Sequence, residues 1–147
     1  MNSVHFPLSP IVPSTEVVHD RVNLELFRGC VRGCRFCQAG HVYRPIRAKS
    51  PELLAEQGKA LLKNTGCQDI TLLSLSSSDY RCLSELCDEL LGYCEPRSIG
   101  LSLPSLRADN FSMDIMHRIQ KTRKSGLTFA PEAGSQRLRD AINKNVT

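Results

Sequence analysis

Apolar residues follow a strand-like spacing in four short segments of the chain and a helical spacing in the segments after them. The strand-like runs occupy residues 22–27, 70–75, 98–103 and 127–130. The helical patterns occupy residues 51–65, 83–94 and 112–124, and a fourth begins near residue 135. Strands that alternate with helices of this length are typical of right-handed βαβ crossovers. The pattern therefore predicts an α/β fold built on a parallel sheet.

Capping residues set the predicted helix boundaries. The first helix begins with Ser50 as N-cap and Pro51 at the first helical position, and Gly66 ends it. Ser78 or Asp79 is predicted to cap the second helix. The apolar faces of the second, third and fourth helices consist of Leu83, Leu86, Cys87, Leu90, Leu91, Cys94, Ile115, Met116, Ile119, Leu138, Ala141 and Ile142. Residues 1–20 contain three prolines and no periodic pattern, so we expect an extended lead-in.

Polar clusters follow the predicted strands at the points where the strands end. Three cysteines come after the first strand, Ser76–Asp79 after the second, Ser105 and Arg107 after the third, and Glu132 after the fourth. In folds of this kind the loops after the strands gather at one rim, where function is located. Serine, aspartate and glycine also form ordinary turns, so the serine run alone has a second explanation. Together, the clusters predict an active rim.

The densest cluster is the segment R-G-C-V-R-G-C-R-F-C-Q-A-G at residues 28–40. Cys30, Cys34 and Cys37 are close enough in sequence to converge on one metal centre. A structural zinc site takes four protein ligands, and a cubane [4Fe–4S] cluster normally takes four cysteines, so three leave one position open. Two alternatives are buried core thiols and a zinc site completed by His41 or Cys67. We predict that Cys67, Cys82, Cys87 and Cys94 are core thiols.

Composition limits the class of protein. The 147 residues are 41% hydrophobic and 23% charged, which is typical of one globular domain. The sequence contains no apolar run of membrane-spanning length and no secretory signal pattern. The odd number of cysteines, seven, therefore favours reduced thiols and a cytoplasmic location. The net charge of +4 is mildly basic and spread along the chain, which is weak evidence for nucleic-acid binding.

Two motifs resemble a known family. C-V-R-G-C-R-F-C, with an aromatic residue before the last cysteine and a strand before the first, resembles the signature of the radical S-adenosylmethionine superfamily. The R-G-C start and P-E-A-G-S-Q-R-L-R at 131–139 resemble the branch that includes methylthiotransferases and cobalamin-associated radical enzymes. The resemblance extends from about residue 22 onward. It implies a TIM-like (βα) barrel of which about four of six units are present, with residues 21–147 as a C-terminally incomplete core domain.

The resemblance also implies cofactors and a reaction. Cys30, Cys34 and Cys37 would hold a [4Fe–4S] cluster, and S-adenosylmethionine would occupy the open iron. Reductive cleavage of S-adenosylmethionine would give a 5′-deoxyadenosyl radical for hydrogen abstraction. The electron would come from a donor such as a flavodoxin or a ferredoxin. The barrel is incomplete, so we expect turnover only in a longer protein or a complex.

Roles for the other rim residues follow from the same resemblance. Phe36 would shield the cluster or approach the adenine. Ser76, Ser77 and Ser78 stand where the family often has a Gly-Gly-Glu-like segment that contacts the methionine amino group, and in this sequence Asp79 would supply the acid. Ser105 and Arg107 would meet the methionine carboxylate. Glu132 would contact polar groups of the cofactor.

Two other functions are compatible with parts of the sequence. One is a non-catalytic zinc or iron–sulfur module that docks a partner. The other is an RNA-modifying enzyme, which the basic balance favours but which the absence of a Lys/Arg-rich patch disfavours. An iron–sulfur signal that responds to S-adenosylmethionine would separate a radical core from a zinc module. No membrane partner is expected.

Overall fold

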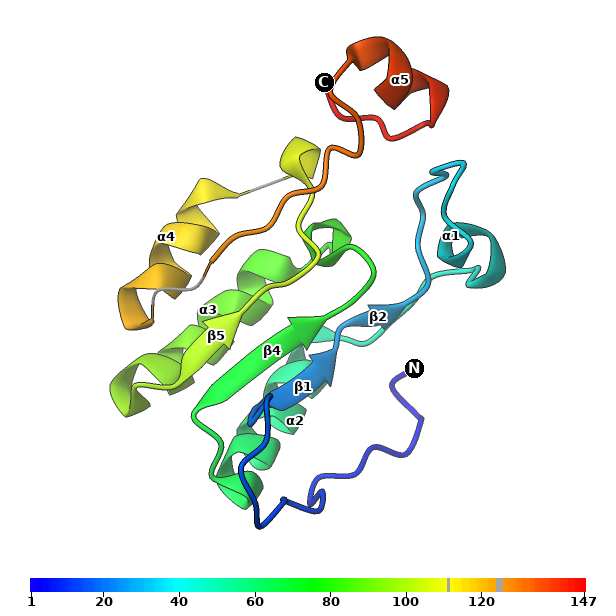
Figure 1. The fold of residues 1–147 in the computed structure, drawn as a ribbon. Helices are drawn as coiled ribbons and strands as arrows, with labels where there is room; N and C mark the ends of the chain where they lie inside the picture. Colours follow the sequence, from blue (N-terminus) through cyan, green and yellow to red (C-terminus); the bar gives the residue numbers. More distant parts are fainter. Residues whose placement is uncertain (111, 124–125) are drawn as a thin grey trace.

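Three of the predicted strands pair in parallel and in chain order. The computed structural model describes residues 1–110, 112–123 and 126–147. Its main sheet has the order β1 (Val22–Glu25), β4 (Asp69–Leu73) and β5 (Gly100–Ser102). The helices that connect these strands lie on one side of the sheet (Figure 1). Sequential strand order with helices on one face is the arrangement of a βα barrel, so the chain forms a partial barrel.

The core lies between this sheet and helices α2 (Pro51–Thr65) and α3 (Leu83–Cys94). In β1, the buried residues Val22 and Leu24 alternate with Asn23 and Glu25, which are not buried. Side chains along a strand point to opposite faces in turn, so the apolar set faces the helices. The buried helical residues are Leu54, Ala55, Gln57, Gly58, Leu61, Leu62, Leu86, Cys87, Leu90, Leu91 and Cys94. Each large apolar side chain buried here stabilises the fold by about 1.5–3 kcal/mol.

The cysteines of α3 are core residues, as predicted. Cys87 and Cys94 are fully buried. Burial raises the pKa of Cys87 to about 12 and that of Cys94 to about 11, because a thiolate is poorly solvated in the core. Cys67 and Cys82 are partly buried and pack against the core. These four thiols therefore belong to the packing of the domain.

Helix α2 begins and ends where the sequence predicts. Ser50 has the extended backbone of an N-cap, and Pro51 occupies the first helical position. Gly66 adopts a left-handed conformation with φ of 75° and donates its N–H to the carbonyl of Leu62 at 3.0 Å. This geometry favours glycine because a side chain at this φ is strained.

The predicted cap of α3 is wrong. Cys82 is its N-cap, and Ser77–Asp79 form a separate 3₁₀ turn, η1. The carboxylate of Asp79 instead accepts hydrogen bonds from the side chains of Arg32, Ser76 and Asn110. A short polar side chain near a helix start is a common capping signal, but here the side chain forms tertiary contacts instead of capping the helix.

The first predicted strand divides at Leu26. Residues Phe27–Arg28 form β2, which pairs antiparallel with β3 (Arg47–Ala48). The cysteine loop and the short helix α1 (Ala39–Val42) lie between them. We call residues 27–48 the cysteine hairpin. It extends beyond the carboxyl end of β1, at the end of the molecule where α5 also lies (Figure 1). Two-residue strands and a four-residue helix are too short to show a periodic pattern, so the sequence does not predict them.

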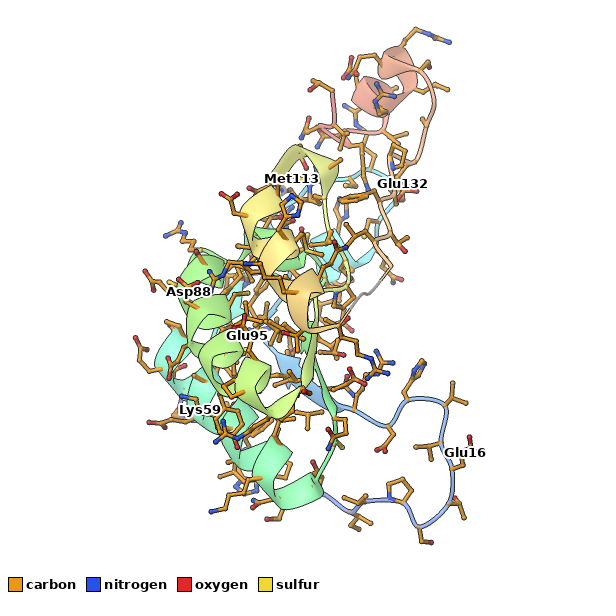
Figure 2. The ribbon with its side chains drawn as sticks, turned by 90° about the vertical axis from the view of Figure 1, so that its left-hand side faces the viewer. Glu16, Lys59, Asp88, Glu95, Met113 and Glu132 are labelled. Carbon is orange, nitrogen blue, oxygen red and sulfur yellow. The ribbon has the colours of Figure 1, made fainter. Side chains whose placement is uncertain are left out.

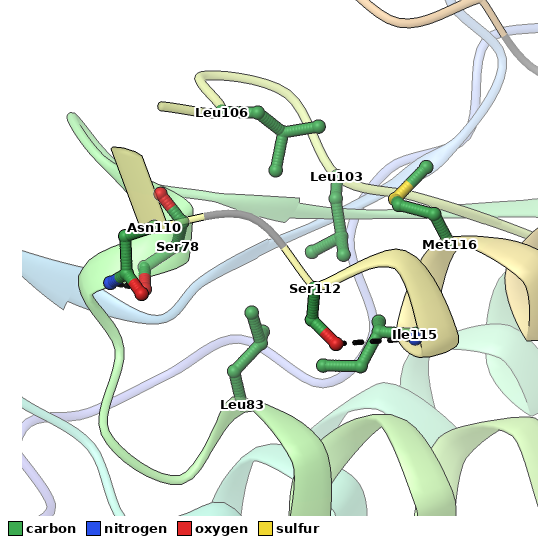
Figure 3. Close-up of a pocket in the computed structure, with 8 residues that line it drawn as sticks. All are labelled: Ser78, Leu83, Leu103, Leu106, Asn110, Ser112, Ile115 and Met116. Atoms are coloured by element: carbon green, nitrogen blue, oxygen red, sulfur yellow. Dashed lines mark hydrogen bonds between the residues drawn. The ribbon is translucent and has the colours of Figure 1, made fainter. Parts of the chain in front are cut away.

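Helix α4 (Met113–Thr122) matches the third predicted helix. It buries Ile115, Met116 and Ile119, and the hydroxyl of Ser112 accepts a hydrogen bond from the Ile115 N–H at 3.4 Å (Figure 3). Lys124, the predicted end of this helix, lies outside the described residues. Two short 3₁₀ turns, η2 (Glu95–Arg97) and η3 (Ala108–Asn110), precede β5 and α4 respectively.

The fourth predicted strand is wrong in extent. Residues 127–130 form one parallel bridge, between Leu106 and Phe129, instead of a strand. Helix α5 (Gln136–Ala141) starts after Ser135, whose hydroxyl accepts from the Leu138 N–H at 3.4 Å, as the pattern predicts. However, none of its residues is buried, so its apolar residues do not pack into the core. Beyond β5, the sheet therefore continues only as the single bridge between Leu106 and Phe129.

The lead-in at residues 1–21 contains no helix or strand. Phe6 packs against the core beneath Lys49, whose Nζ lies 4.0 Å from the ring centroid. Asn2 accepts a hydrogen bond from the Ser50 N–H at 3.0 Å. Glu16 lies on a loop at the opposite end of the molecule from Glu132 (Figure 2). Within the described ranges, no helix has the length and apolarity needed to cross a membrane.

Candidate metal and cofactor site

A cavity of about 250 Å³ lies between the cysteine hairpin and the loops that follow β4 and β5. Its lining includes every residue to which the family resemblance gives a role in the site, except Ser77, Ser78 and Asp79. The residues around it are Cys30, Arg32, Cys34, Phe36, Cys37, Ala39, Leu75, Ser76, Ser105, Leu106, Arg107, Ala130, Glu132 and Lys144. Segments more than a hundred residues apart in sequence therefore meet at one rim, as expected for the carboxyl ends of parallel strands.

Two glycines allow the cysteine loop to fold tightly. Gly29 has φ of 100°, and a Cβ there would lie 2.6 Å from the carbonyl oxygen of Tyr43. A Cβ on Gly40 would lie 2.8 Å from the carbonyl oxygen of Arg32. Both distances are too short for a carbon atom, so the backbone path of the loop requires glycine at both positions.

The three thiols lie at different depths along the cavity wall. Cys30 and Cys34 are buried and Cys37 is partly buried. The N–H of Arg32 points to the Sγ atom of Cys30 at 3.4 Å, and the Cys37 N–H donates to the carbonyl of Cys34 at 3.1 Å. Backbone N–H groups that point to sulfur would stabilise negative charge on it.

The arrangement of the thiols bears on which metal centre fits. Over the described part of the chain, no three His, Cys, Asp or Glu side chains are grouped so that they could hold one metal ion. A cubane cluster makes a different demand, because each cysteine binds a separate iron. Three unpaired thiols around a cavity provide that donor set, so the residues present fit a cluster with three protein ligands.

An ionic network ties the cysteine loop to the serine loop. Arg32 donates through Nε to Oδ2 of Asp79 at 2.8 Å and through Nη2 to Oδ1. Ser76 Oγ and Asn110 Nδ2 donate to the same carboxylate at 2.7 and 3.3 Å. Burial opposes ionisation of Asp79, but the hydrogen bonds from Arg32, Ser76 and Asn110 outweigh it and lower its pKa to about 2. Asp79 therefore holds two site loops together and does not line the cavity.

The structure separates the three serines. Ser76 lines the cysteine cavity. Ser77 is fully buried, and its hydroxyl donates to the carbonyl of Leu72 at 3.2 Å. Ser78 lines a different cavity of about 160 Å³ near the start of α4 (Figure 3), and its Oγ accepts from the Arg107 N–H at 3.2 Å. The cysteine cavity therefore receives one of the three predicted serines.

Arg107 lines the cavity, but its guanidinium is already engaged. Its Nε and Nη2 atoms donate to the two carboxylate oxygens of Asp109 at 2.9 and 2.8 Å. Nη2 also donates to the carbonyl of Lys144 at 2.7 Å. Burial opposes ionisation of Asp109, but Arg107 and then Arg32 lower its pKa. Asp109 thus links the two arginines of the site, a role that its sequence position did not indicate.

Ser105 and Glu132 line the cavity in left-handed backbone conformations, with φ of 60° and 69°. Such conformations are costly for residues with a side chain and concentrate at functional sites. The carboxylate of Glu132 accepts from Lys144 Nζ at 3.1 Å, and the same ammonium lies 6.0 Å from the ring centroid of Phe36. Lys144 belongs to no motif that indicated a site residue in the sequence.

The segment around Lys144 reaches the cavity because it is fastened to the cysteine loop. Asn143 Nδ2 donates to the carbonyl of Gly33 at 2.8 Å, and the Arg35 N–H donates to the carbonyl of Ile142 at 2.9 Å. Asn143 and Asn145 both have positive φ, near 55°. Asparagine tolerates this conformation better than most residues, so the Asn-Lys-Asn sequence is a signal that could have indicated the turn.

Comparison with known proteins identifies the family. Residues 24–147 match the family described as the Radical SAM superfamily. The match begins within β1 and covers the cysteine hairpin and every later element.

Two relatives from Methanocaldococcus jannaschii are similar over most of this chain. One carries the name "Uncharacterized protein MJ0966" and is 40% identical over 126 residues, which are 84% of this chain and 26% of that protein. The other carries the name "Putative methylthiotransferase MJ0865" and is 26% identical over 137 residues, which are 85% of this chain and 29% of that protein. The chain therefore spans less than a third of either relative.

Proposed function

The chain belongs to the radical S-adenosylmethionine superfamily, and from this membership and the cysteine cavity we propose that it binds a [4Fe–4S] cluster and S-adenosylmethionine. Cys30, Cys34 and Cys37 are the proposed cluster ligands. When bound, these cofactors would supply a 5′-deoxyadenosyl radical by one-electron cleavage of the sulfonium. The observation that carries the proposal is one cavity lined by all three cysteines and by the polar residues of two neighbouring strand ends.

The chain's own side chains would bind and orient the nucleoside cofactor. Ser76 and Ser105 present hydroxyls to the cavity, and Glu132 and Lys144 present a paired carboxylate and ammonium. The amino-acid end of S-adenosylmethionine carries an ammonium and a carboxylate. These groups can therefore form ion pairs with Glu132 and Lys144 in place of the pair that the two side chains form with each other. Arg107 would place positive charge close to the methionine carboxylate of the cofactor. Asp109 would fix the orientation of the Arg107 guanidinium. The exposed ring of Phe36 would cover the cluster or stack near the adenine.

We also propose a context for the reaction. Residues 21–147 would form the cofactor-binding core, and hydrogen abstraction would be completed in a longer protein or complex, because the chain spans less than a third of its relatives. Seven free thiols fit a reducing compartment, which we propose to be the cytoplasm. A soluble one-electron carrier would supply the electron.

Anaerobic reconstitution with iron and sulfide tests the cluster. We expect broad brown absorbance, close to four irons per chain, and binding of S-adenosylmethionine in equilibrium dialysis that depends on the cluster. Substitution of Cys30, Cys34 or Cys37 by alanine should abolish the absorbance, because each ligand holds a separate iron. A full cluster in any one of these variants would contradict the ligand assignment.

The same samples test the alternative of a zinc module. Purified protein would then contain about one zinc per chain in place of iron, remain colourless, and show no retention of S-adenosylmethionine. That result would replace the radical function with a binding role. Zinc and iron contents measured by plasma emission spectroscopy distinguish the two outcomes.

A further inference from the structure

Positive charge is concentrated around the cysteine loop. No aspartate or glutamate occurs between Glu25 and Glu52. This interval contains six cations: Arg28, Arg32, Arg35, Arg44, Arg47 and Lys49. The whole chain has 19 Lys and Arg against 15 Asp and Glu, so without these six the remainder has 13 against 15. The mild excess of positive charge therefore comes from the cysteine hairpin and the adjacent Lys49, and the prediction that it is spread along the chain is wrong.

Only part of this charge is neutralised by other residues of the protein. Arg28 pairs with Glu25, and Arg32 pairs with Asp79. Arg35, Arg44 and Arg47 are exposed and form no ion pair with any residue of the described ranges. We call these three the hairpin arginines.

The guanidinium groups of two hairpin arginines are held by the backbone. Arg35 donates to the carbonyl of Ala141, and Arg44 donates to the carbonyl of Gly40. These contacts orient the side chains without removing their charge. An oriented cation loses less conformational entropy when a partner binds, so such a side chain is suited to recognition.

Large apolar side chains are exposed on the same hairpin. Val31, Val42 and Tyr43 have 61%, 60% and 49% of their surface exposed. Within the hairpin, α1 lies apart from the helices α2, α3 and α4 (Figure 1). Arginine and aromatic residues next to apolar area are typical of the centres of protein–protein interfaces.

We propose that the outer surface of the cysteine hairpin docks an acidic one-electron carrier protein through the hairpin arginines and the exposed Val31, Val42 and Tyr43. The inference rests on the proposed function, because the hairpin supplies all three proposed cluster ligands. One electron would leave the reduced carrier and enter the cluster, with no bond formed or broken. A negatively charged carrier complements this surface, and the exposed apolar side chains favour a protein partner over a nucleic-acid backbone.

Binding of the reconstituted protein to purified carriers tests the proposal. The probes are an acidic flavodoxin and an acidic ferredoxin, with an unmodified transfer RNA as a third ligand, measured by biolayer interferometry. We expect both carriers, or one of them, to bind the wild type, with an association rate that falls on the order of tenfold between about 0.05 M and about 0.3 M salt. The triple variant Arg35→Gln, Arg44→Gln, Arg47→Gln should lose on the order of tenfold in association rate at low salt.

A matched variant controls for net charge. Lys63→Gln, Arg97→Gln and Lys121→Gln remove the same charge from exposed positions on or next to the helical layer, and should change the association rate less than about twofold. Dithionite should still reduce the cluster of the hairpin variant, with an unchanged EPR signal. If the triple variant does not fold, the double variant Arg35→Gln, Arg47→Gln replaces it.

Three results would overturn the inference. The first is equal carrier binding by the hairpin and control variants. The second is binding of neither carrier by a wild-type protein that carries a cluster and cleaves S-adenosylmethionine with dithionite. The third is transfer RNA binding that depends on the hairpin arginines while carrier binding does not. The second result leaves the proposed function intact, whereas a wild-type protein that takes up no cluster contradicts the proposed function itself.

Discussion

Asp79 shows how one carboxylate organises the site at the scale of single residues. Its side chain is 9% exposed and accepts hydrogen bonds from three other side chains. The sequence suggested that this acid would contact the cofactor, in the place of the family's glutamate. In the structure it joins the cysteine loop, the serine loop and the turn at Asn110, so it would act on the proposed cofactor only through the positions of these loops.

The lowered pKa of Asp79 predicts a loss of stability in acid. The ordinary pKa of 3.8 is lowered to about 2 in the folded protein, so the ion pair stabilises the fold above pH 3.8 and loses this effect as pH falls toward 2. The stabilisation is about 2 kcal/mol. Asp79→Asn should remove that contribution near pH 6, and its free energy of unfolding should depend less on pH in this window, measured by urea titration.

A surface carboxylate provides the control for Asp79. Asp88 pairs with Arg118, and its side chain is 53% exposed. Asp88→Asn should cost less than about 1 kcal/mol because solvent screens exposed pairs. An Asp79→Asn protein as stable as Asp88→Asn would show that the Arg32 pair does not fasten the loops.

Cys87 tests whether the thiols divide into ligands and core residues. It is fully buried and does not line the cysteine cavity. Cys87→Ala should lower the free energy of unfolding by about 1–2 kcal/mol through lost packing, and should leave the reconstituted cluster absorbance unchanged. Loss of that absorbance in a folded Cys87→Ala protein would contradict the assignment of three ligands.

At the scale of elements, periodic sequence patterns predicted the helices that pack their apolar faces into the core. The helices α2, α3 and α4 bury the apolar faces that their sequences indicate. The cysteine hairpin has two-residue strands and is held by tertiary contacts, so no local pattern could reveal it. Residues 127–130 have strand-like sequence, but each of Leu127 and Phe129 is 37% exposed and only one bridge forms.

Gly29 tests the hairpin as an element. Alanine there would be strained at φ of 100° and would meet the Tyr43 carbonyl oxygen at 2.6 Å, so β2 and β3 must separate. We expect Gly29→Ala to cost about 1–3 kcal/mol and to lower cluster occupancy. Iron content and thermal unfolding measure the two effects.

Gly92 provides a matched glycine within α3. A Cβ there would meet no atom within 4 Å, so Gly92→Ala should stabilise the helix by up to about 1 kcal/mol and leave iron content unchanged. If the two variants gave equal iron content, the tight path of the hairpin would not be needed for cluster binding.

At the scale of the whole molecule, the site is assembled from segments far apart in sequence. The strand–helix pattern predicted that the loops after the strands would share a rim, and the cavity lining agrees for the cysteines, Ser76, Ser105, Arg107 and Glu132. The cross-links between those loops could not be predicted in the same way. Lys144, Asp109 and Asn143 act through contacts that depend on how the elements are placed in three dimensions.

The measurement that most directly tests the central claim is electron–nuclear double resonance of the reduced, reconstituted protein with S-adenosylmethionine labelled isotopically at its amino nitrogen and carboxylate. The three proposed cysteine ligands would leave one iron open, so we predict hyperfine coupling between the cluster spin and both labelled positions. The coupling should disappear when unlabelled S-adenosylhomocysteine replaces the labelled S-adenosylmethionine. A reduced cluster whose spectrum shows no coupling to either label would contradict the account, because the open iron would then not be the cofactor site.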